Sequence, residues 1–434
     1  MTDRRILVVG AGPAGLSAAV TLAQAGQRVV VVDQAPQIGG TVYAQNRTGV
    51  TRPLSHAKER RALFDLVEAQ RIRIDIHCST SFVGLDYQGN ALITGADGFL
   101  FQPKAVIMAT GARELVQPRP GWTLPGVTSV GALQVDLKTA GRPPEGRIAI
   151  AGSGSLLYAL GAQLTRAGKA PAAIIDAAHP FMHPLATARL PLHILQEATG
   201  FILTLIRARV PILSGTRILS VEEKKGALSL KTNHGGRFRT VEVDRLGLHD
   251  GLARNDYGLQ KNATIPVIAA GDCRDVLGRL AAVKDGNRVA AEILNLLGTP
   301  APGISLTSLN TEKAAQRRLK SIFAHDGCND LNDLPDETIL CRCENRSLAD
   351  LKALTATDQT PRMLRLNGRF GMGACQGRFC LDWVAKLTAT EMGPGPSRPQ
   401  RWPLKPVLIA EILNAADHSG NETHIEENAK CTFR

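Results

Sequence analysis

The residue types with the clearest chemistry in this chain are four cysteines near its C-terminal end. They form a C-x-C pair and a C-x4-C pair separated by residues 344–374, and they are Cys341, Cys343, Cys375 and Cys380. Two close thiol pairs joined by one helix-sized insertion can supply the four thiolates that an iron–sulfur cluster needs. Tetrahedral zinc is the alternative, but zinc sites more often have C-x2-4-C knuckles in both halves. The spacing therefore favours an iron–sulfur cluster.

A glycine-rich turn, Gly10-Ala-Gly12-Pro-Ala-Gly15, lies close to the start of the chain. The apolar residues before it predict a strand, the residues after it predict a helix to about Ala25, and a second strand ends at Asp33. In such a unit Gly10 permits the tight turn, Gly12 lets the backbone approach a pyrophosphate, and Gly15 packs the helix on the strand. Asp33 accepts from a ribose hydroxyl. This spacing predicts a dinucleotide site.

A second element favours FAD over NAD as the dinucleotide. The predicted strand Val267–Ala270 ends in Gly271-Asp272, which can bring a carboxylate to the ribityl chain while the backbone stays close to the flavin. Gly39-Gly40 follows Asp33, and the predicted strand Ala105–Ala109 leads into Thr110-Gly111. The predicted FAD-binding residues are Gly10, Gly12, Pro13, Ala14, Gly15, Asp33, Gly40, Thr110, Gly111, Gly271 and Asp272.

A second glycine turn follows the predicted strand Arg147–Ala151. Gly152 and Gly154 are present and the next strand ends at Asp176, but Leu157 occupies the third position, where Gly or Ala packs more closely. No arginine cluster follows Asp176 to mark a phosphate of NADP. We expect the fold of a second dinucleotide-binding domain here, which holds NAD(P)H, another nucleotide or nothing.

Two expected signals of catalysis are missing. No C-x-x-C motif lies between the glycine turns, so the redox disulfide of thioredoxin-reductase-like enzymes is absent. His179, His183, His193, His249 and Asp250 are scattered, and we predict packing or surface roles for them and name no catalytic residue. The segment that starts at His249-Asp250 could instead shape a flavin-side or subunit contact. The isolated cysteines are expected to be ordinary thiols: Cys78, Cys273, Cys328 and Cys431.

These patterns predict an α/β fold with two interleaved Rossmann-like dinucleotide-binding domains and a small C-terminal cluster domain. We expect an FAD-binding domain over residues 1–115 and 244–300, interrupted by a second dinucleotide-binding-like domain over residues 116–243. A linker is predicted over residues 301–335, the cluster domain over residues 336–390, and a C-terminal arm and tail over residues 391–434.

Composition limits the possible partners. The net charge of +12 is spread along the chain and aromatic residues make up 4%, which argues against nucleic-acid binding and favours an electropositive docking face. The most apolar segment, Phe201–Leu213, is too short to span a membrane and contains two arginines. The N-terminus lacks the features of a secretory signal. We expect a cytoplasmic protein whose membrane association, if any, runs through a partner.

Taken together, these motifs resemble those of the alpha (A) subunits of multi-subunit amine-oxidising flavoenzymes. That family includes the opine oxidases, hydrogen cyanide synthase and the dye-linked proline or hydroxyproline dehydrogenases. The resemblance covers nearly the whole chain. It is carried by the first glycine turn, Gly121-Trp-Thr-Leu-Pro-Gly126, His249-Asp-Gly251, Gly271-Asp272, Cys341-Arg-Cys343-Glu-Asn and Gly373-Ala-Cys375-Gln-Gly-Arg-Phe-Cys380.

The resemblance implies a thioredoxin-reductase-like FAD protein with a ferredoxin-associated [2Fe-2S] domain. It implies a beta subunit, similar to D-amino-acid or glycine oxidases, that carries the amine site, and an external acceptor such as a quinone. A small gamma subunit, an FMN at a subunit interface and an ATP-like nucleotide in the second domain remain open. Two alternative hypotheses remain. The chain could be a self-contained NAD(P)H-dependent reductase of a ferredoxin-like acceptor, or a redox-sensing scaffold subunit.

Overall fold

A computed structural model describes residues 5–46, 56–95, 98–257, 264–303, 305, 307–325, 331–356, 360–388, 403–404 and 406–417. The N-terminal domain is built on a five-stranded parallel sheet. Its strands, in spatial order, are β18 (Val267–Ala269), β7 (Val106–Met108), β1 (Ile6–Val9), β2 (Val29–Val32) and β3 (Ile74–His77). Strands β1 and β2 are apolar at every position because both faces of this sheet are covered.

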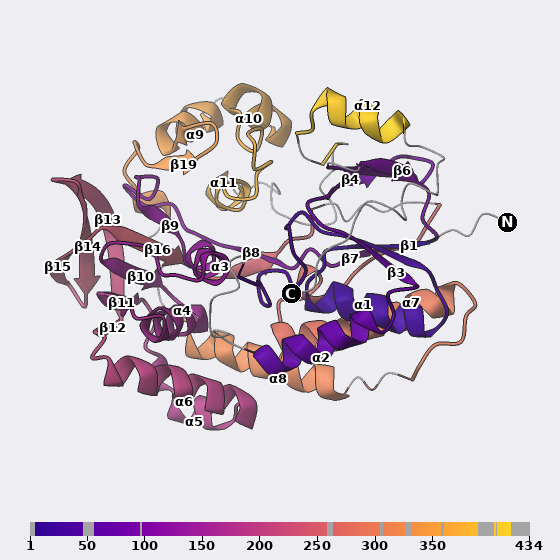
Figure 1. The fold of residues 1–434 in the computed structure, drawn as a ribbon. Helices are drawn as coiled ribbons and strands as arrows, with labels where there is room; N and C mark the ends of the chain where they lie inside the picture. Colours follow the sequence, from indigo (N-terminus) through magenta and orange to yellow (C-terminus); the bar gives the residue numbers. More distant parts are fainter. Residues whose placement is uncertain are drawn as a thin grey trace.

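Successive residues of β1 enter different cores, as the alternation of a strand requires. Ile6 and Val8 pack with residues of three helices, α1 (Pro13–Gln24), α2 (Ala57–Glu68) and α7 (Arg279–Leu296). Leu7 and Val9 pack on the opposite side against an antiparallel sheet of β4 (Ser81–Leu85), β5 (Ala91–Thr94) and β6 (Phe99–Phe101). In Figure 1 the helices lie below the parallel sheet and β4 and β6 lie above it.

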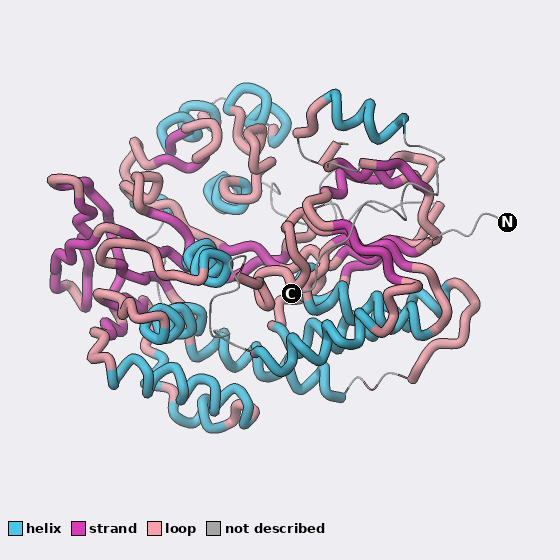
Figure 2. The backbone as a smooth tube through the Cα atoms, in the orientation of Figure 1, coloured by secondary structure: helices cyan, strands magenta, loops and turns pink. Residues whose placement is uncertain are grey.

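The second domain repeats this three-layer plan, as the colouring by secondary structure in Figure 2 makes clear. Its parallel sheet has the order β12 (Ile212–Ser214), β11 (Ala173–Asp176), β10 (Ile148–Gly152), β16 (Arg245–His249) and β9 (Val127–Ser129). One face packs on α3 (Val130–Ala140), α4 (Ser155–Arg166) and α6 (Leu192–Arg207). The other face packs on an antiparallel sheet of β13 (Thr216–Lys224), β14 (Ala227–His234) and β15 (Arg237–Val243).

Two short antiparallel strands join these domains. The chain leaves the first sheet through β8 (Ala112–Glu114) and returns through β17 (Leu252–Arg254), with Ala253 paired to Arg113. The second domain is therefore inserted between β7 and β18 of the first, and the predicted interleaved α/β fold is confirmed.

The remaining described elements follow α7. Helix α8 (Thr307–Ile322) packs on α7 and on α5 (Pro184–Ala188). The cysteine module, residues 331–356 and 360–388, has its own apolar core. Its elements are β19 (Ile339–Cys341), β20 (Arg346–Ser347), α9 (Leu348–Thr355), α10 (Pro361–Gly368) and α11 (Leu381–Thr388). Helix α12 (Ile409–Asp417) packs on β5 and β6.

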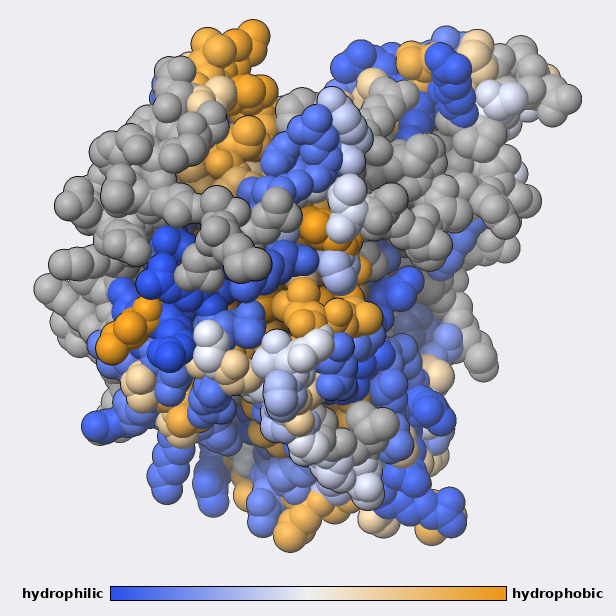
Figure 3. Space-filling view, turned by 90° about the vertical axis from the view of Figure 1, so that its right-hand side faces the viewer, coloured by the Kyte–Doolittle hydropathy of each residue, from blue (hydrophilic) through white to orange (hydrophobic). Residues whose placement is uncertain are grey.

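In Figure 3, the described residues at the end of the molecule drawn at the right of Figure 1 are largely hydrophilic. Figure 3 shows apolar residues gathered at the upper edge and near the centre of this face. No helix within the described ranges has both the length and the apolar character needed to cross a bilayer.

Candidate flavin-binding and cysteine sites

The first glycine turn has the geometry that the sequence predicts. Gly10 has φ +108°, and a Cβ atom there would lie 2.4 Å from the carbonyl oxygen of Ala109. A Cβ atom at Gly15 would lie 1.9 Å from the carbonyl oxygen of Gly10, so helix α1 packs directly against the turn. Pro13 begins α1, and no side chain caps the helix at Gly12. The amides of its first turn are therefore available to an anion.

Asp33 lies directly after β2, beside the turn. Its carboxylate accepts from the backbone amides of Ala11, at 2.7 Å, and Ala35, at 2.8 Å. Burial raises the pKa of Asp33 above its ordinary value, and these two amides oppose that shift. Each carboxylate oxygen has a second lone pair, so a ribose hydroxyl can still donate to this group.

Gly39 and Gly40 fold back over the same turn. The amide of Gly39 donates to the carbonyl of Ala11 at 2.8 Å, and a Cβ atom at Gly40 would lie 3.0 Å from Cα of Gly12. The next residues contact a lysine that the sequence analysis did not single out. The Nζ atom of Lys138 in α3 donates to the carbonyls of Thr41, at 2.9 Å, and Val42, at 3.1 Å.

Lys138 joins the two domains beside the predicted flavin site. It is buried, and among the described residues no carboxylate forms an ion pair with it. Burial lowers the pKa of Lys138 to about 8. The local sequence gives no signal for this contact because Lys138 and the Thr41–Val42 segment meet only in the tertiary structure.

The Gly-Asp strand end lies against the start of α1. Gly271 has φ +64°, and a Cβ atom there would lie 2.6 Å from Cβ of Ala14. Asp272 accepts from the amides of Leu277, at 2.9 Å, and Gly278, at 3.0 Å, through one carboxylate oxygen. Burial raises the pKa of Asp272. One oxygen thus holds the loop before α7, and the other is not engaged by these amides.

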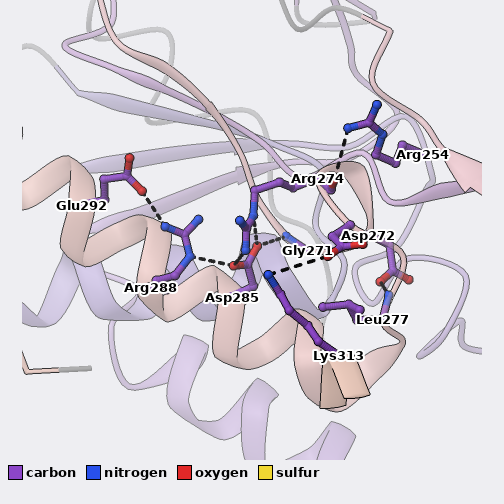
Figure 4. Close-up of polar contacts among 10 residues, drawn as sticks. Arg254, Gly271, Asp272, Arg274, Leu277, Asp285, Arg288, Glu292 and Lys313 are labelled. Atoms are coloured by element: carbon purple, nitrogen blue, oxygen red, sulfur yellow. Dashed lines mark hydrogen bonds and ion pairs between the residues drawn. The ribbon is translucent and has the colours of Figure 1, made fainter. Parts of the chain in front are cut away.

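A second unpredicted residue, Asp285 of α7, fixes this strand end from below (Figure 4). Its carboxylate accepts from the amide of Gly271 at 2.8 Å and from Nε of Arg288 at 2.8 Å, and it pairs with Arg274. Burial by itself raises the pKa of Asp285, but the two arginines outweigh it and the net pKa lies below the ordinary value. Asp285 is therefore held as a carboxylate that orients Gly271.

Thr110 and Gly111 complete the arrangement at the end of β7. The hydroxyl of Thr110 donates to the carbonyl of Asn255 at 2.5 Å and lies 3.2 Å from the sulfur of Cys273. The amide of Asn255 donates to the carbonyl of Gly111 at 3.0 Å. The predicted flavin residues therefore gather at one edge of the sheet, beyond the carboxyl ends of β1, β2, β7 and β18, where ligands of open α/β sheets bind.

The four cysteines of the cysteine module lie together as two pairs. The thiol of Cys380 hydrogen-bonds to Cys341 and lowers the pKa of Cys341 to about 6, whereas the pKa of Cys380 itself is raised by the same contact. Cys343 lies beside Cys375, and burial raises the pKa of Cys343. Within the described ranges no three His, Cys, Asp or Glu side chains are grouped as metal ligands. The structure thus brings the four cysteines together as two neighbouring pairs.

The second glycine turn is built differently from the first. Gly152 and Gly154 have φ +131° and +134°, and Leu157 is fully buried in the core between the sheet and α4. Asp176 is buried, and its carboxylate accepts from the hydroxyl of Tyr158 at 2.7 Å and from the amide of Ala178 at 2.9 Å. Burial raises the pKa of Asp176 to about 6.

The chain also covers this second turn with its own residues. The hydroxyl of Ser153 donates to the carbonyl of Phe323, just past the end of α8, at 3.0 Å, and the rings of Phe323 and Tyr158 are 6.1 Å apart. A Cβ atom at Gly154 would lie 3.2 Å from the ring of His249. Internal contacts therefore engage the Ser153 hydroxyl and the Asp176 carboxylate at this turn.

The scattered histidines do not converge. His249 contacts Glu114 of β8 at 2.6 Å, and Asp250 pairs with Arg119, so this segment fastens the crossover between the domains. His193 lies 3.6 Å from Glu312 of α8. One expectation about the isolated cysteines was wrong, because Cys78 is disulfide-bonded. Cys273 is a buried thiol as expected, and Cys328 and Cys431 lie outside the described residues.

The fold and the first glycine turn define a flavin-dependent oxidoreductase with two dinucleotide-binding folds. The chain belongs to the family described as pyridine nucleotide-disulphide oxidoreductase, whose model matches residues 4–274.

The chain has relatives that match almost its whole length. It is 28% identical to the A subunit of opine oxidase from Agrobacterium tumefaciens (strain Ach5), over 94% of this chain and 91% of that protein. It is 27% identical to the HcnB subunit of hydrogen cyanide synthase from Pseudomonas protegens, over 92% of this chain and 96% of that protein. The resemblance inferred from the sequence motifs is confirmed.

Two solved structures share the fold. L-proline dehydrogenase from P. horikoshii superimposes with a TM-score of 0.64 and 18% identity, over 94% of this chain and 79% of that one. Thioredoxin reductase of T. acidophilum superimposes with a TM-score of 0.50 and 17% identity, over 68% of this chain and 99% of that one. The thioredoxin-reductase-like part of the predicted fold is confirmed, and the [2Fe-2S] assignment of the cysteine module stays a prediction.

Proposed function

We propose that this chain is the electron-relay subunit of a heteromeric amine, opine or imino-acid dehydrogenase. In this proposal it binds FAD at the first glycine turn and a [2Fe-2S] cluster at the four cysteines. The observation that carries the proposal is the presence, in one chain, of a flavin-type sheet edge and a four-cysteine module that packs on the crossover between the domains. The names of the relatives, which are subunits of multi-subunit enzymes, support a relay role rather than a complete enzyme.

The residues at the sheet edge fit FAD. Gly12 and the uncapped start of α1 would face the pyrophosphate, Asp33 would accept from the ribose, and the second oxygen of Asp272 would accept from the ribityl chain. Gly10, Pro13, Ala14, Gly15, Gly40, Thr110, Gly111 and Gly271 would supply the close backbone approach.

The cysteine module could hold a thiolate-bound cluster, because it supplies four thiols and backbone amides that face a sulfur. Amides of Cys343, Glu344 and Gly371 point at the sulfur of Cys341. A Cβ atom at Gly373 would lie 2.4 Å from Cβ of Cys343, so that only glycine leaves room there. Amides that donate to ligating sulfurs tune the potential of such clusters. A flavin accepts two electrons whereas a [2Fe-2S] cluster carries one, so the pair would pass electrons on singly.

The rest of the proposal concerns partners. A beta subunit similar to D-amino-acid or glycine oxidases would oxidise the C–N bond of the amine, and an external acceptor such as a quinone would take the electrons. A cytoplasmic location, an FMN at the subunit interface and a small gamma subunit belong to the same proposal. The second domain would serve chiefly as structure, because Tyr158 engages Asp176 and Phe323 engages Ser153 at its glycine turn.

The self-contained NAD(P)H-dependent reductase is the alternative that these contacts oppose. An anaerobic absorption titration of the purified chain with NADH and NADPH, with iron, sulfide and flavin assayed on the same sample, separates the two functions. We expect flavin and cluster bands that neither nucleotide bleaches. Stoichiometric bleaching by either nucleotide would establish the reductase, and a sample without iron or sulfide would refute the cluster.

A further inference from the structure

The cysteine module is seated on the crossover between the domains through two aromatic side chains. The indole nitrogen of Trp122 donates to the carbonyl of Ile339 at 2.7 Å, and the guanidinium of Arg342 lies 5.3 Å from the centre of the Trp122 ring. At the second contact, the guanidinium of Arg378 lies over the ring of Tyr257, 4.4 Å from its centre. Both cationic residues come from the segments that carry the cysteines.

Arg378 lies between Cys375 and Cys380 in sequence and is tied to that loop. Its guanidinium donates to the carbonyl of Cys375 at 3.0 Å. Its own carbonyl accepts from Arg113 of β8 at 2.7 Å, and Arg113 forms an ion pair with Asp382 of α11. Arg378 therefore cannot move without disturbing either the cysteine loop or its contact with β8.

The charges at this contact do not cancel. Arg113 and Asp382 neutralise each other, whereas among the described residues no carboxylate forms an ion pair with Arg378. The Arg378 side chain is half-buried, so its guanidinium is partly removed from water. One positive charge is thus left next to the cysteine loop, where solvent screens it poorly.

The same contact is close along the chain to the predicted flavin edge. Tyr257 lies two residues after Asn255, whose side chain donates to the carbonyl of Thr110 at 3.1 Å and whose carbonyl accepts from the Thr110 hydroxyl. A short run of chain therefore connects the end of β7 to the ring on which Arg378 rests.

We propose that Arg378, held between Tyr257 and the Cys375–Cys380 loop, raises the reduction potential of the cluster so that an electron moves from the flavin towards the cysteine module. A fixed positive charge favours the form of a site that has gained an electron, and local charge is one of the features that set the potentials of iron–sulfur clusters. Arg378 acts here as a positioning and tuning residue and ligates nothing. This inference rests on the proposed function.

The test is an anaerobic redox titration of the full chain, followed by the EPR signal of the reduced cluster. Arg378→Gln should lower the equilibrium constant for cluster reduction roughly tenfold, a shift of about 59 mV to more negative potential for a one-electron couple. Arg378→Lys, which keeps the charge, should recover most of the shift. Arg362→Gln is the matched control, because Arg362 is exposed on α10 of the same module.

Asp382→Asn gives an independent check of opposite sign. It removes a negative charge from the contact and should shift the potential to more positive values. Equal potentials in Arg378→Gln, Asp382→Asn and Arg362→Gln would overturn the inference, as would loss of iron from both Arg378→Gln and Asp382→Asn. Absence of iron and sulfide from the unaltered chain would instead refute the proposed function, so the two failures are distinguishable.

Discussion

At the scale of single residues, the predicted flavin site depends on glycines, because a Cβ atom would not fit at their positions. Gly15 lies inside α1, where alanine would ordinarily be the better helix former, yet a Cβ atom there would meet the carbonyl of Gly10 at 1.9 Å. The clash is with backbone, which has no rotamer to change. The turn itself would therefore have to move, and with it the amides that face the pyrophosphate.

Gly15→Ala should weaken FAD binding. Overpacking of this kind costs about 1–3 kcal/mol, which is roughly a five- to 150-fold loss of affinity if the cost falls on the bound state. Gly200→Ala is the matched control, because Gly200 also lies within a helix but its Cβ would meet only the end of Arg166, at 3.9 Å. Flavin titration of both apoproteins is the measurement. Equal affinities would show that the turn does not bind the flavin.

Asp176 allows a prediction about pH. Its pKa in the folded chain is about 6, above the ordinary 3.8, so the folded state binds the proton more tightly than the unfolded state. The stability of the unaltered protein should therefore fall as the pH rises from about 4 to about 6 and stay lower above that range. At 1.36 kcal/mol for each pKa unit, the loss is at most about 3 kcal/mol.

Asp176→Asn removes this cost. We expect a higher melting temperature than that of the unaltered protein at pH 7.5, and a flatter dependence of melting temperature on pH between pH 4 and 6. Thermal unfolding across that range is the measurement. If the variant is less stable at pH 7.5 and keeps the full slope, the titration belongs to another group.

At the scale of elements, the two domains are held in register by side chains from the crossover. Asp250 follows β16 and accepts from the amide of Gln117 at 2.7 Å, and it pairs with Arg119. The Arg119 and Asp250 side chains are only 6% and 11% exposed. A buried pair of this kind adds little net stability, but breaking it leaves an uncompensated charge.

Arg119→Met should lower the free energy of unfolding by about 3–5 kcal/mol, because Asp250 loses its partner in a buried position. Arg61→Met is the control: Arg61 pairs with Asp65, both are largely exposed, and such pairs contribute at most about 1 kcal/mol. Urea unfolding of both variants is the measurement. Similar losses of unfolding free energy in the two variants would mean that the Arg119–Asp250 pair does not hold the domains together.

Elements that follow local rules could be predicted from the sequence. The glycine turns, the strand ends at Asp33 and Asp176, and the inserted second domain all follow from strand, turn and helix spacing. Lys138 and Asp285 could not be predicted, because the backbone groups that they hold near the flavin edge lie on other elements and their helices look ordinary. The cover over the second turn was missed for the same reason, since Phe323 reaches it only after α8 has packed.

At the scale of the whole molecule, the domain with the flavin-type edge and the cysteine module have separate hydrophobic cores. The residues of the cysteine module form their own apolar cluster, whereas the predicted FAD residues lie at the edge of the first sheet, which has a different core. Trp122, Tyr257 and Arg113 contact the cysteine module, and none of these three residues is among the predicted FAD-binding residues. Each cofactor should therefore be removable without the other.

Cys375→Ser should abolish the cluster and leave the flavin. A hydroxyl is a poor substitute for a thiolate at iron, so we expect less than about a tenth of the iron and sulfide of the unaltered chain, with an unchanged ratio of flavin to protein. Cys273→Ser is the matched control, because Cys273 is a buried thiol outside the cysteine module and its loss should leave the iron in place. Retained iron with an unaltered visible spectrum in Cys375→Ser would remove Cys375 from the ligand set. Loss of flavin together with iron would show instead that the first domain depends on the module seated on its crossover, and that the chain works as one unit rather than two.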